Sequence, residues 1–369
     1  MRILHINRNY LTSVMHQEMI EALDCLGCEN TVFVPTTKDA VARIAPNANV
    51  QVSACFCHFD RFFFHLKQLK ILNALKKSNK KERFDIIHAY TLFTDGGVAY
   101  KRHMKTGEPY VVAVRNTDVN AFFRLMPHLR RYGLQIMLHA SAIFFLSENY
   151  REMVFSHYIP RRFRDVLYAK TYIIPNGLPK FWLENVYSRN DDCIQQPIRV
   201  LYAGRIDRNK NISTTQAAIS LLRDEGCDVR LTVIGEVEDM KEYKKIAADP
   251  FTTCLPAIPR LQLLPIYREH QLFVMPSFTE TFGLVYLEAL TQGLPVVYTK
   301  GQGFDGQFPE GTVGYHVDPR SPKSIAEAIM RILEHYKVIT ENAAQAVSRY
   351  AWSEIARRYD DIYQNIKKG

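Results

Sequence analysis

Hydrophobic and polar positions along the chain alternate between two kinds of segment. Short runs rich in Val, Ile and Phe are followed by longer stretches in which apolar residues recur every three or four positions. In the first half the short runs lie at 2–7, 31–35, 50–54, 85–90, 110–115, 142–147 and 172–175. Nearly continuous apolar runs are typical of strands that a parallel sheet buries on both faces. The pattern therefore predicts an α/β fold.

The same alternation occurs a second time after an interruption. Helical patterns such as 15–26 and 64–80 separate the first runs, and the turn-forming residues 176–179 and a polar stretch at 188–197 follow. Further strands are expected at 199–203, 230–234, 272–275, 295–298 and 315–317. We predict two Rossmann-like, doubly wound parallel-sheet domains facing a cleft, at 1–182 and 183–350. The last segment, 351–369, is a helix pattern with one apolar side that we expect to pack back on the N-terminal domain.

Charge is distributed unevenly between the two halves. The 369 residues carry a net charge of +9, and residues 1–185 hold 25 Lys and Arg against 15 Asp and Glu. The basic half suggests an acidic partner. No stretch has the roughly 18 apolar residues that cross a membrane. The N-terminal segment, which becomes polar at Asn7, is too short for a signal peptide. We expect a cytoplasmic protein.

Seven cysteines and no export signal favour reduced thiols. Cys25 and Cys28 form a CxxC and Cys55 and Cys57 a CxC, which together could supply four zinc ligands. No histidine or turn pattern frames these pairs, so we interpret them as the end of a helix and the end of a strand. No metal site is expected.

The segment 274–298 carries the most informative chemistry. A strand ends at Met275-Pro276-Ser277, a loop carries Glu280, and a helix begins near Gly283. The free amides at the start of a helix bind anions, and glycine there permits close approach of a ligand. Glu288 lies two turns into the helix, about 80° round from Glu280. A carboxylate there suits the vicinal hydroxyls of a ribose, although this spacing alone is common in surface helices.

A second loop adds two cations. Arg205 follows the strand that ends at Ala203, and Lys210 begins the next segment. Arg can bind a diphosphate bidentately and Lys can act as a point charge. One such pair is usually solvated surface, but this pair precedes the glutamate-bearing helix within one doubly wound unit.

These motifs together resemble retaining glycosyltransferases of the GT-B class, family 4 (glycosyl transferases group 1), which includes bacterial capsule, lipopolysaccharide and mannosyl transferases. The C-terminal motifs are AGRIDRNK, VIGE, PSFTETFGLVYLEAL and GLPVV; the N-terminal half matches more loosely through FDIIHAY, IFFLSE and IIPNG. The resemblance covers nearly the whole chain and does not specify the sugar.

The resemblance implies a role for each matching residue. Arg205 and Lys210 would neutralise the donor diphosphate, and Glu288 would bind the ribose. Glu280 would contact the transferred sugar, with the amides of Phe282, Gly283 and Leu284 on its hydroxyls or on phosphate. Such enzymes typically need no metal, and the chain has no Asp-x-Asp.

Two departures from the family pattern concern the N-terminal half. Members often carry a glycine pair after the first strand, where this chain has Arg8-Asn9, and many carry His-Gly-x-Asp where it has Arg115-Asn116-Thr117-Asp118. Asp118 matches and Arg115 replaces the histidine. Asp118, Arg115 and Glu280 are therefore the candidate catalytic residues.

The remaining motifs do not indicate another function. Residues 301–306 spell GxGxxG, but Pro309, Gly311 and Gly314 follow where a dinucleotide fold needs a helix, so we favour a loop near the donor. No GxxxxGK[ST] is present. His5 and His88, at strand ends, are more often structural than catalytic.

The expected function is transfer of a sugar from a nucleoside diphosphate-sugar to an acceptor hydroxyl, with retention, in bacterial surface polysaccharide or glycolipid synthesis. A GT-B sugar-nucleotide epimerase and a non-catalytic sugar-nucleotide-binding subunit remain alternatives. The segment 61–83 mixes Phe and Leu with Lys and Arg, as interfacial helices do. It suggests docking on an anionic membrane that holds a lipid-linked acceptor, or else a core helix with a solvated basic face. No nucleic-acid motif accompanies the charge.

Overall fold

The computed structural model divides the chain into two compact units. Unit 1 is Met1–Pro179 with Trp352–Gly369, and unit 2 is Lys180–Ala351. The structure describes residues 1–37, 49–79, 82–189, 194 and 196–368. The sequence-based boundary after residue 182 lies close to this division, and the C-terminal segment belongs to unit 1.

Unit 1 contains a seven-stranded parallel sheet with the order β3-β2-β1-β4-β5-β6-β7. Each of the seven predicted runs forms one of its strands. The strands are β1 (Arg2–Ile6), β2 (Glu29–Thr36), β3 (Val50–Ala54), β4 (Ile86–Ala89), β5 (Tyr110–Ala113), β6 (Ala142–Phe145) and β7 (Thr171–Ile173). The central strands β4, β5 and β6 are buried along their whole length, which is why they read as continuous apolar runs.

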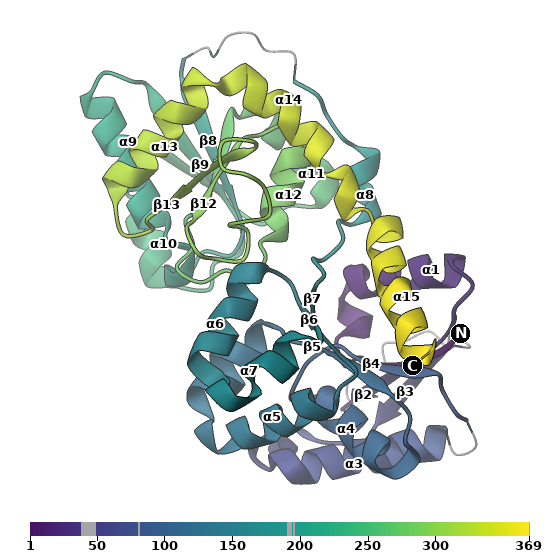
Figure 1. The fold of residues 1–369 in the computed structure, drawn as a ribbon. Helices are drawn as coiled ribbons and strands as arrows, with labels where there is room; N and C mark the ends of the chain where they lie inside the picture. The colour runs from purple at the N-terminus through teal and green to yellow at the C-terminus, as the bar shows by residue number, and fades with distance from the viewer. Residues whose placement is uncertain (38–48, 80–81, 190–193, 195, 369) are drawn as a thin grey trace. The chain divides into compact units, whose positions relative to one another are not determined.

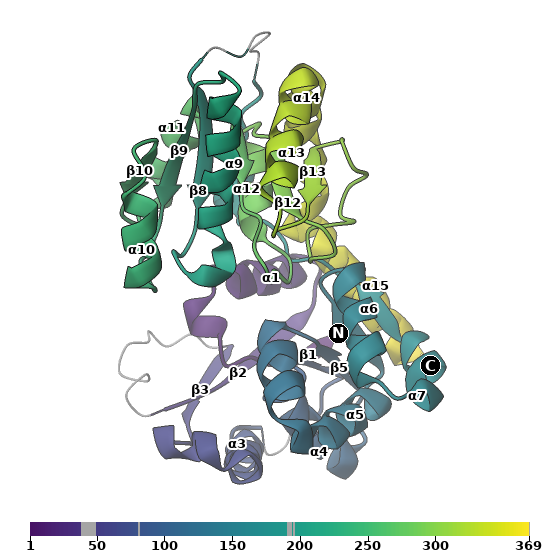
Figure 2. The same cartoon turned by 90° about the vertical axis from the view of Figure 1, so that its left-hand side faces the viewer.

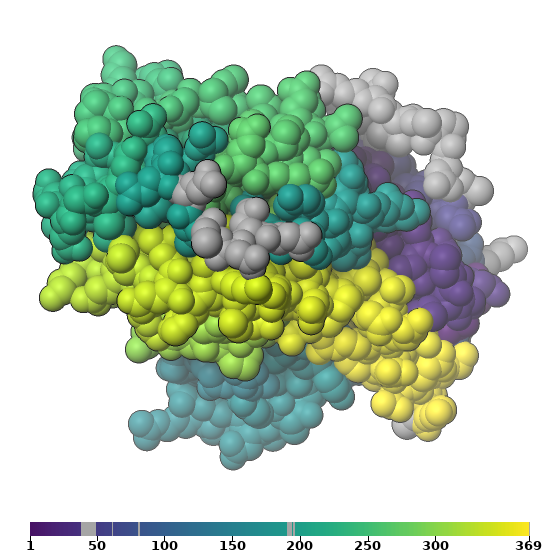
Figure 3. All heavy atoms as spheres, turned by 90° about the horizontal axis from the view of Figure 1, so that it is seen from above, coloured from purple at the N-terminus to yellow at the C-terminus, as the bar shows by residue number. Residues whose placement is uncertain are grey.

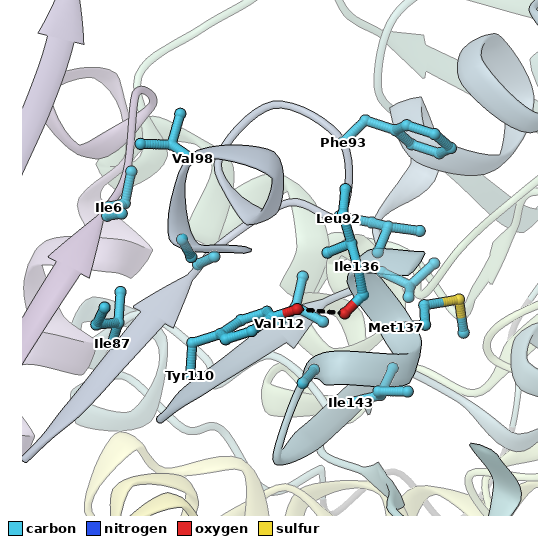
Figure 4. Packing of buried hydrophobic residues seen from close by; sticks show 14 of the residues in the cluster. Ile6, Ile87, Leu92, Phe93, Val98, Tyr110, Val112, Ile136, Met137 and Ile143 are labelled. Atoms are coloured by element: carbon cyan, nitrogen blue, oxygen red, sulfur yellow. Dashed lines mark hydrogen bonds between the residues drawn. The ribbon is translucent and has the colours of Figure 1, made fainter. Parts of the chain in front are cut away.

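Helices cover both faces of this sheet (Figure 1). They are α1 (Val14–Cys25), α3 (Phe64–Ser78), α4 (Gly96–Thr106), α5 (Arg130–His139), α6 (Glu148–Tyr158), α7 (Arg161–Tyr168) and α15 (Trp352–Lys368), with short helical turns η1 (Tyr10–Thr12), η2 (His58–Phe62), η3 (Asp118–Phe123) and η4 (Pro127–Leu129). Figure 4 shows the core between the sheet and α4 and α5, where the Tyr110 hydroxyl donates a hydrogen bond to the Ile136 carbonyl at 2.5 Å.

The terminal helix α15 packs on unit 1 through its predicted apolar side. Ile355, Tyr359 and Ile362 are buried in one cluster with Met19 and Leu23 of α1. Figure 1 shows α15, in yellow, beside α1. The last helix of the chain therefore completes the hydrophobic core of the first unit.

Unit 2 contains a six-stranded parallel sheet with the order β10-β9-β8-β11-β12-β13. Its strands are β8 (Ile198–Ala203), β9 (Val229–Ile234), β10 (Thr252–Leu255), β11 (Leu272–Val274), β12 (Val296–Thr299) and β13 (Gly314–Val317). The sequence pattern predicts five of these strands and misses β10. This edge strand reads Thr-Thr-Cys-Leu and none of its residues is fully buried, so it lacks the apolar run of the others.

The helices of unit 2 again lie on both faces of the sheet. They are α8 (Lys180–Glu184), α9 (Ile212–Asp224), α10 (Met240–Ala247), α11 (Arg260–Glu269), α12 (Leu284–Thr291), α13 (Pro322–Glu334) and α14 (Tyr336–Ala346), with short turns η5 (Arg208–Lys210) and η6 (Ser348–Tyr350). Figure 2 shows α9 and α13 side by side. Figure 3 shows α13 and α14 as a yellow-green band on the surface of unit 2. Within the described residues no helix is both long and apolar enough to cross a membrane.

Each sheet has one point where the strand order reverses, which we call its switch point. In unit 1 it lies between β1 and β4, and in unit 2 between β8 and β11. The loops after the two strands turn to opposite faces there, and open parallel sheets bind their ligands in the resulting crevice. The loops that carry Arg205, Lys210 and Glu280 follow β8 and β11, whereas Arg115 and Asp118 follow β5, the neighbour of β4 in the sheet of unit 1.

Candidate functional site

In unit 2 the loops that follow β8 and β11 are joined directly by hydrogen bonds. The Asn209 side chain donates to the Thr279 carbonyl and accepts from the Thr279 amide, both at 3.0 Å. The Phe278 amide donates to the Asn209 carbonyl at 2.8 Å. The two motifs that carry the predicted cations and the predicted Glu280 therefore form one structural element at the switch point of the sheet.

Lys210 and Glu280 form an ion pair within this junction. The Lys210 Nζ lies 2.8 Å from Glu280 Oε2, and the two side chains are 14% and 15% exposed. The other Glu280 oxygen accepts from the Thr281 amide at 3.1 Å, and the Asp207 carboxylate accepts from the Lys210 amide at 3.0 Å. An ammonium group has three donors, so Lys210 can hold Glu280 and still bind a second anionic group.

The segment that leads into α12 supplies unpaired amides shortly after Glu280. Gly283 precedes the helix with φ 79°, a left-handed conformation, and a Cβ there would lie 2.4 Å from the Tyr286 ring. Among the described residues, no hydrogen bond uses the amides of Phe282, Gly283 or Leu284. Because such amides and the helix dipole attract negative charge, the site can bind an anion.

The GxGxxG stretch braces the same loop. Residues 301–306 form turns and no helix, as the sequence predicts. The Gly303 amide donates to the Glu280 carbonyl at 2.7 Å, and the Gln302 side chain accepts from the Glu280 amide at 2.8 Å. A Cβ on Gly303 would lie 1.8 Å from the Thr281 carbonyl oxygen. Glycine is therefore required there so that the two loops can touch.

Arg205 lies in the loop after β8 and is exposed. Its Nη1 is 2.7 Å from Glu238 Oε1, and both side chains are exposed. The loops after β8 and β9 approach so closely that a Cβ on Gly235 would lie 1.7 Å from the Gly204 carbonyl oxygen. The structure thus pairs Lys210 with Glu280, whereas Arg205 pairs with a carboxylate of the neighbouring loop.

Glu288 is half-buried on α12. Burial raises the pKa of its carboxyl to about 7, against the opposing effects of the Arg260 charge and the Trp182 indole. A carboxyl of this kind changes protonation near neutral pH and can accept hydrogen bonds from hydroxyl groups. Its predicted role in ribose binding stays a prediction.

The remaining candidates, Asp118 and Arg115, belong to unit 1. The Asp118 carboxylate is 1% exposed and accepts from the amides of Leu92, Phe93 and Arg115 at 3.0, 3.0 and 2.9 Å. Burial raises its pKa to about 6, opposed by these amides. The Arg115 Nη1 donates to Asn176 Oδ1 at 2.8 Å. Asp118 thus ties the loop after β4 to the loop after β5, and its predicted catalytic role remains untested.

A pocket at the switch point of unit 1 includes residues that the sequence motifs did not single out. It has a volume of about 370 Å³ and is lined by Arg8, Asn9, Pro35, Phe56, Phe64, Lys67, Gln68, Ile71, Thr91, Thr94, Asp95, Thr117, Asp118, Ala121, Phe122 and Met126. Asp95 lies in no motif, and Lys67 reads as one of many lysines in a basic segment. In the sequence this place is marked by Arg8-Asn9, which replaces the usual glycine pair, and by Asp118, a candidate catalytic residue.

His5 and His88, the two histidines that the sequence places near strand ends, are fully buried in the core. His5 contacts the Tyr90 hydroxyl at 3.1 Å and Asn30 Oδ1 at 2.8 Å, and burial lowers its pKa to about 4. His88 Nδ1 lies 2.6 Å from the Tyr363 hydroxyl of α15. Within the described part of the chain, no three His, Cys, Asp or Glu side chains cluster as metal ligands would.

Comparison with known proteins identifies the family. A model described as Glycosyltransferase Family 4 matches residues 13–179, and one described as Glycosyl transferases group 1 matches residues 189–351. The chain therefore belongs to the GT-B glycosyltransferases of the family 4 type, and its two-domain α/β fold is the one predicted.

Individual relatives are distant. The chain is 29% identical over 187 residues to D-inositol 3-phosphate glycosyltransferase of Corynebacterium kroppenstedtii, covering 46% of this chain and 41% of the relative. It is 28% identical over 237 residues to lipopolysaccharide 1,2-N-acetylglucosaminetransferase of Salmonella typhimurium, covering 56% and 61%. The chain thus spans less than two thirds of either relative. The structure of Anabaena HepE in complex with UDP-glucose has a similar fold, with TM-score 0.70, 16% identity and coverage of 99% and 100%.

The raised pKa of Glu288 predicts a pH-dependent cost to stability. The folded carboxyl holds its proton up to about pH 7, whereas the unfolded one releases it near 4.5. The folded protein then binds more protons in this window, and its free energy of unfolding falls as pH rises. Glu288→Gln should remove up to about 3 kcal/mol of this fall, less where water screens the half-buried carboxyl.

Urea unfolding at pH 5 and pH 8 measures this difference. Glu327→Gln, on the exposed side of α13, serves as the control and should follow the parent protein at both pH values. If Glu288→Gln and the parent lose equal stability between pH 5 and 8, the Glu288 carboxyl is not buried as described.

Proposed function

We propose that this protein transfers a sugar from a nucleoside diphosphate-sugar to an acceptor hydroxyl, with retention at the anomeric carbon. The observation that carries the proposal is the junction at the switch point of unit 2. There the Lys210–Glu280 ion pair lies in the loops that lead to three unpaired amides at and just before the start of α12. A cation, an anion-binding helix terminus and a carboxylate suit a diphosphate attached to a hydroxylated sugar.

The chemistry follows from where charge develops. As the bond between the anomeric carbon and the leaving phosphate breaks, negative charge grows on the diphosphate. The Lys210 ammonium and the amides of Phe282, Gly283 and Leu284 then stabilise the transition state more than the bound donor. Arg205 adds charge from the loop edge, Glu280 orients sugar hydroxyls, and Glu288 accepts from the ribose. This mechanism needs no divalent metal.

The names of similar proteins support the donor class and leave the acceptor open. HepE was solved with UDP-glucose, and the Salmonella relative is named for transfer of N-acetylglucosamine in lipopolysaccharide. We place this protein in the synthesis of a bacterial surface polysaccharide or glycolipid. An epimerase would convert the donor without an acceptor, and a non-catalytic subunit would bind donor and never release nucleotide.

Exposed apolar side chains on unit 1 support the proposal that the protein binds to a membrane surface. Phe59, Phe62 and Phe63 are 77%, 68% and 63% exposed, and Leu66 and Leu69 of α3 are about half exposed. We call these five residues the aromatic patch. Contiguous exposed apolar side chains of this size commonly mark a binding surface. The opposite side of α3 is buried through Gln68, Ile71, Leu72 and Leu75.

The charge near the aromatic patch points to an anionic lipid surface. Lys76 and Lys77 are exposed in the last turn of α3, and Lys70 is exposed although paired with Asp60. The predicted basic residues Lys80 and Lys81 lie outside the described residues. We infer that the Phe and Leu side chains of the aromatic patch enter the membrane–water interface. The lysines then contact lipid phosphates at the cytoplasmic face of the membrane.

Co-sedimentation with liposomes tests this docking. The parent protein should bind vesicles that contain anionic lipid, and binding should weaken with salt. Lys76→Glu with Lys77→Glu should weaken binding by at least about 1 kcal/mol per residue, since each lysine contributes about that much. Phe62→Ser with Phe63→Ser should weaken it at any salt concentration. Lys241→Glu with Lys244→Glu, exposed on α10 of unit 2, is the control. If the parent protein does not bind anionic vesicles at low salt, the proposed membrane docking is wrong.

The catalytic proposal predicts a specific kinetic pattern. Arg205→Ala and Lys210→Ala should each lower turnover more than they weaken donor binding, because these cations matter most in the transition state. Glu288→Ala should weaken nucleotide binding roughly ten- to 150-fold, the effect of losing a charged hydrogen bond. Nucleotide release and calorimetry measure these effects in a screen of UDP-, GDP- and ADP-sugars.

The control is Arg208→Ala, an exposed cation of the same loop that should leave turnover near the parent value. A chelator should not change activity. Equal turnover in Lys210→Ala and Arg208→Ala, or a strict requirement for a divalent metal, is incompatible with this mechanism.

A further inference from the structure

The pocket of unit 1 is built around two cations and one aromatic ring. The Lys67 ammonium lies 4.1 Å from the centre of the Phe56 ring, and the Arg8 guanidinium carbon lies 5.8 Å from it. Arg8 follows β1, Lys67 comes from α3, and Phe56 follows β3. Two separate elements therefore bring positive charge, and a third brings the aromatic ring, to one wall of a cavity of about 370 Å³.

These cations have no carboxylate partner at close range. Among the described residues, neither Arg8 nor Lys67 forms an ion pair within 4 Å, whereas Lys70 on the same helix pairs with Asp60 at 2.6 Å. Burial and the charge of Arg8 lower the pKa of Lys67 to about 8, against the opposing charges of Asp60 and Asp95. Two like charges held together at a cavity wall are unfavourable unless an anion is bound between them.

Asp95, also in the pocket, does not neutralise the pair. It is 2% exposed, and its carboxylate accepts a hydrogen bond from the Thr91 hydroxyl at 3.0 Å. Burial raises the pKa of Asp95 to about 7, against the opposing charges of Arg8 and Lys67. The carboxyl therefore carries only part of a negative charge near neutral pH. Its protonated form can donate a hydrogen bond to a ligand.

The remaining walls suit a hydroxylated ring. Thr91, Thr94 and Thr117 contribute hydroxyl groups and Asn9 an amide. Phe64 and Phe122, in edge contact with centroids 5.6 Å apart, form an apolar wall on which the C–H face of a sugar or cyclitol can lie. The pocket thus offers apolar contact, hydroxyl partners and a positively charged wall.

We propose that this pocket binds the acceptor through an anionic substituent, phosphate or carboxylate, carried on a polyhydroxylated ring. The inference rests on the proposed glycosyl transfer and adds the chemical class of its acceptor. Arg8 and Lys67 bind the anion, the threonines and Asp95 hydrogen-bond the ring hydroxyls, and Phe64 and Phe122 contact its apolar face. Neutral sugars of the same size lack the group that these two cations require.

Calorimetry on the full chain with matched probes tests the proposal. The probes are a neutral hexose, the corresponding hexose phosphate, the corresponding hexuronate and inorganic phosphate, together with a short-chain lipid-linked sugar phosphate. The hexose phosphate or hexuronate should bind at least about tenfold more tightly than the hexose, since a charge-assisted hydrogen bond contributes that much. Comparing the two free anionic sugars with the lipid-linked probe distinguishes the sources of the anion.

Substitutions then locate the binding site. Arg8→Gln and Lys67→Gln should each weaken binding of the anionic probe about ten- to 150-fold and leave the neutral hexose unchanged. Lys67→Arg should retain binding, which shows that the loss does not come from misfolding. Arg124→Gln and Lys105→Gln, exposed cations of unit 1 that do not line the pocket, are the controls.

Two results would overturn the proposal. The first is equal affinity for the neutral and anionic probes in the parent protein. The second is a loss of nucleotide-sugar affinity in Arg8→Gln and Lys67→Gln with unchanged acceptor binding, which would assign the cations to the donor. Nucleotide-sugar binding in the same protein separates these failures from a failure of the proposed function: if no nucleotide-sugar binds, glycosyl transfer itself is wrong.

Discussion

The contact between the loop after β8 and the loop after β11 is the constraint on which the candidate donor site depends. The reciprocal hydrogen bonds between Asn209 and Thr279 align the two loops, and the ion pair of Lys210 and Glu280 follows directly from that alignment. Because the loops come from strands on either side of the point where the sheet order reverses, they meet over the crevice and not over one face. A third loop, packed on the second through Gly303, holds the arrangement in place.

Unit 1 repeats this architecture with different chemistry. Its crevice lies between β1 and β4, but the loops there carry Arg8 and Asp95 and are joined by no ion pair comparable to that of Lys210 and Glu280 among the described residues. Asp118 has both oxygens bound to amides and connects the neighbouring loops. In our proposals the two units use the same topological feature for two different ligands, a diphosphate in unit 2 and an acceptor in unit 1.

Much of the fold could be predicted from the sequence because buried parallel strands leave a plain pattern. The strand β10 could not, because an edge strand of Thr, Thr, Cys and Leu has neither an apolar run nor alternation. The sequence motifs place Lys210 and Glu280 in one unit but do not predict their ion pair, and the pairing of Arg205 with Glu238 likewise needs the loop geometry. Arg8, Lys67 and Asp95 come from three elements far apart in sequence, so only the fold brings them together.

The central claim is that unit 2 binds the donor diphosphate at the start of α12. The position of a nucleoside diphosphate in an experimentally determined complex tests it most directly. We expect the terminal phosphate within hydrogen-bond distance of Lys210 Nζ and of at least one amide of Phe282, Gly283 or Leu284, with the ribose hydroxyls on Glu288. Phosphate density in the pocket of unit 1, with the first turn of α12 unoccupied, would contradict the account.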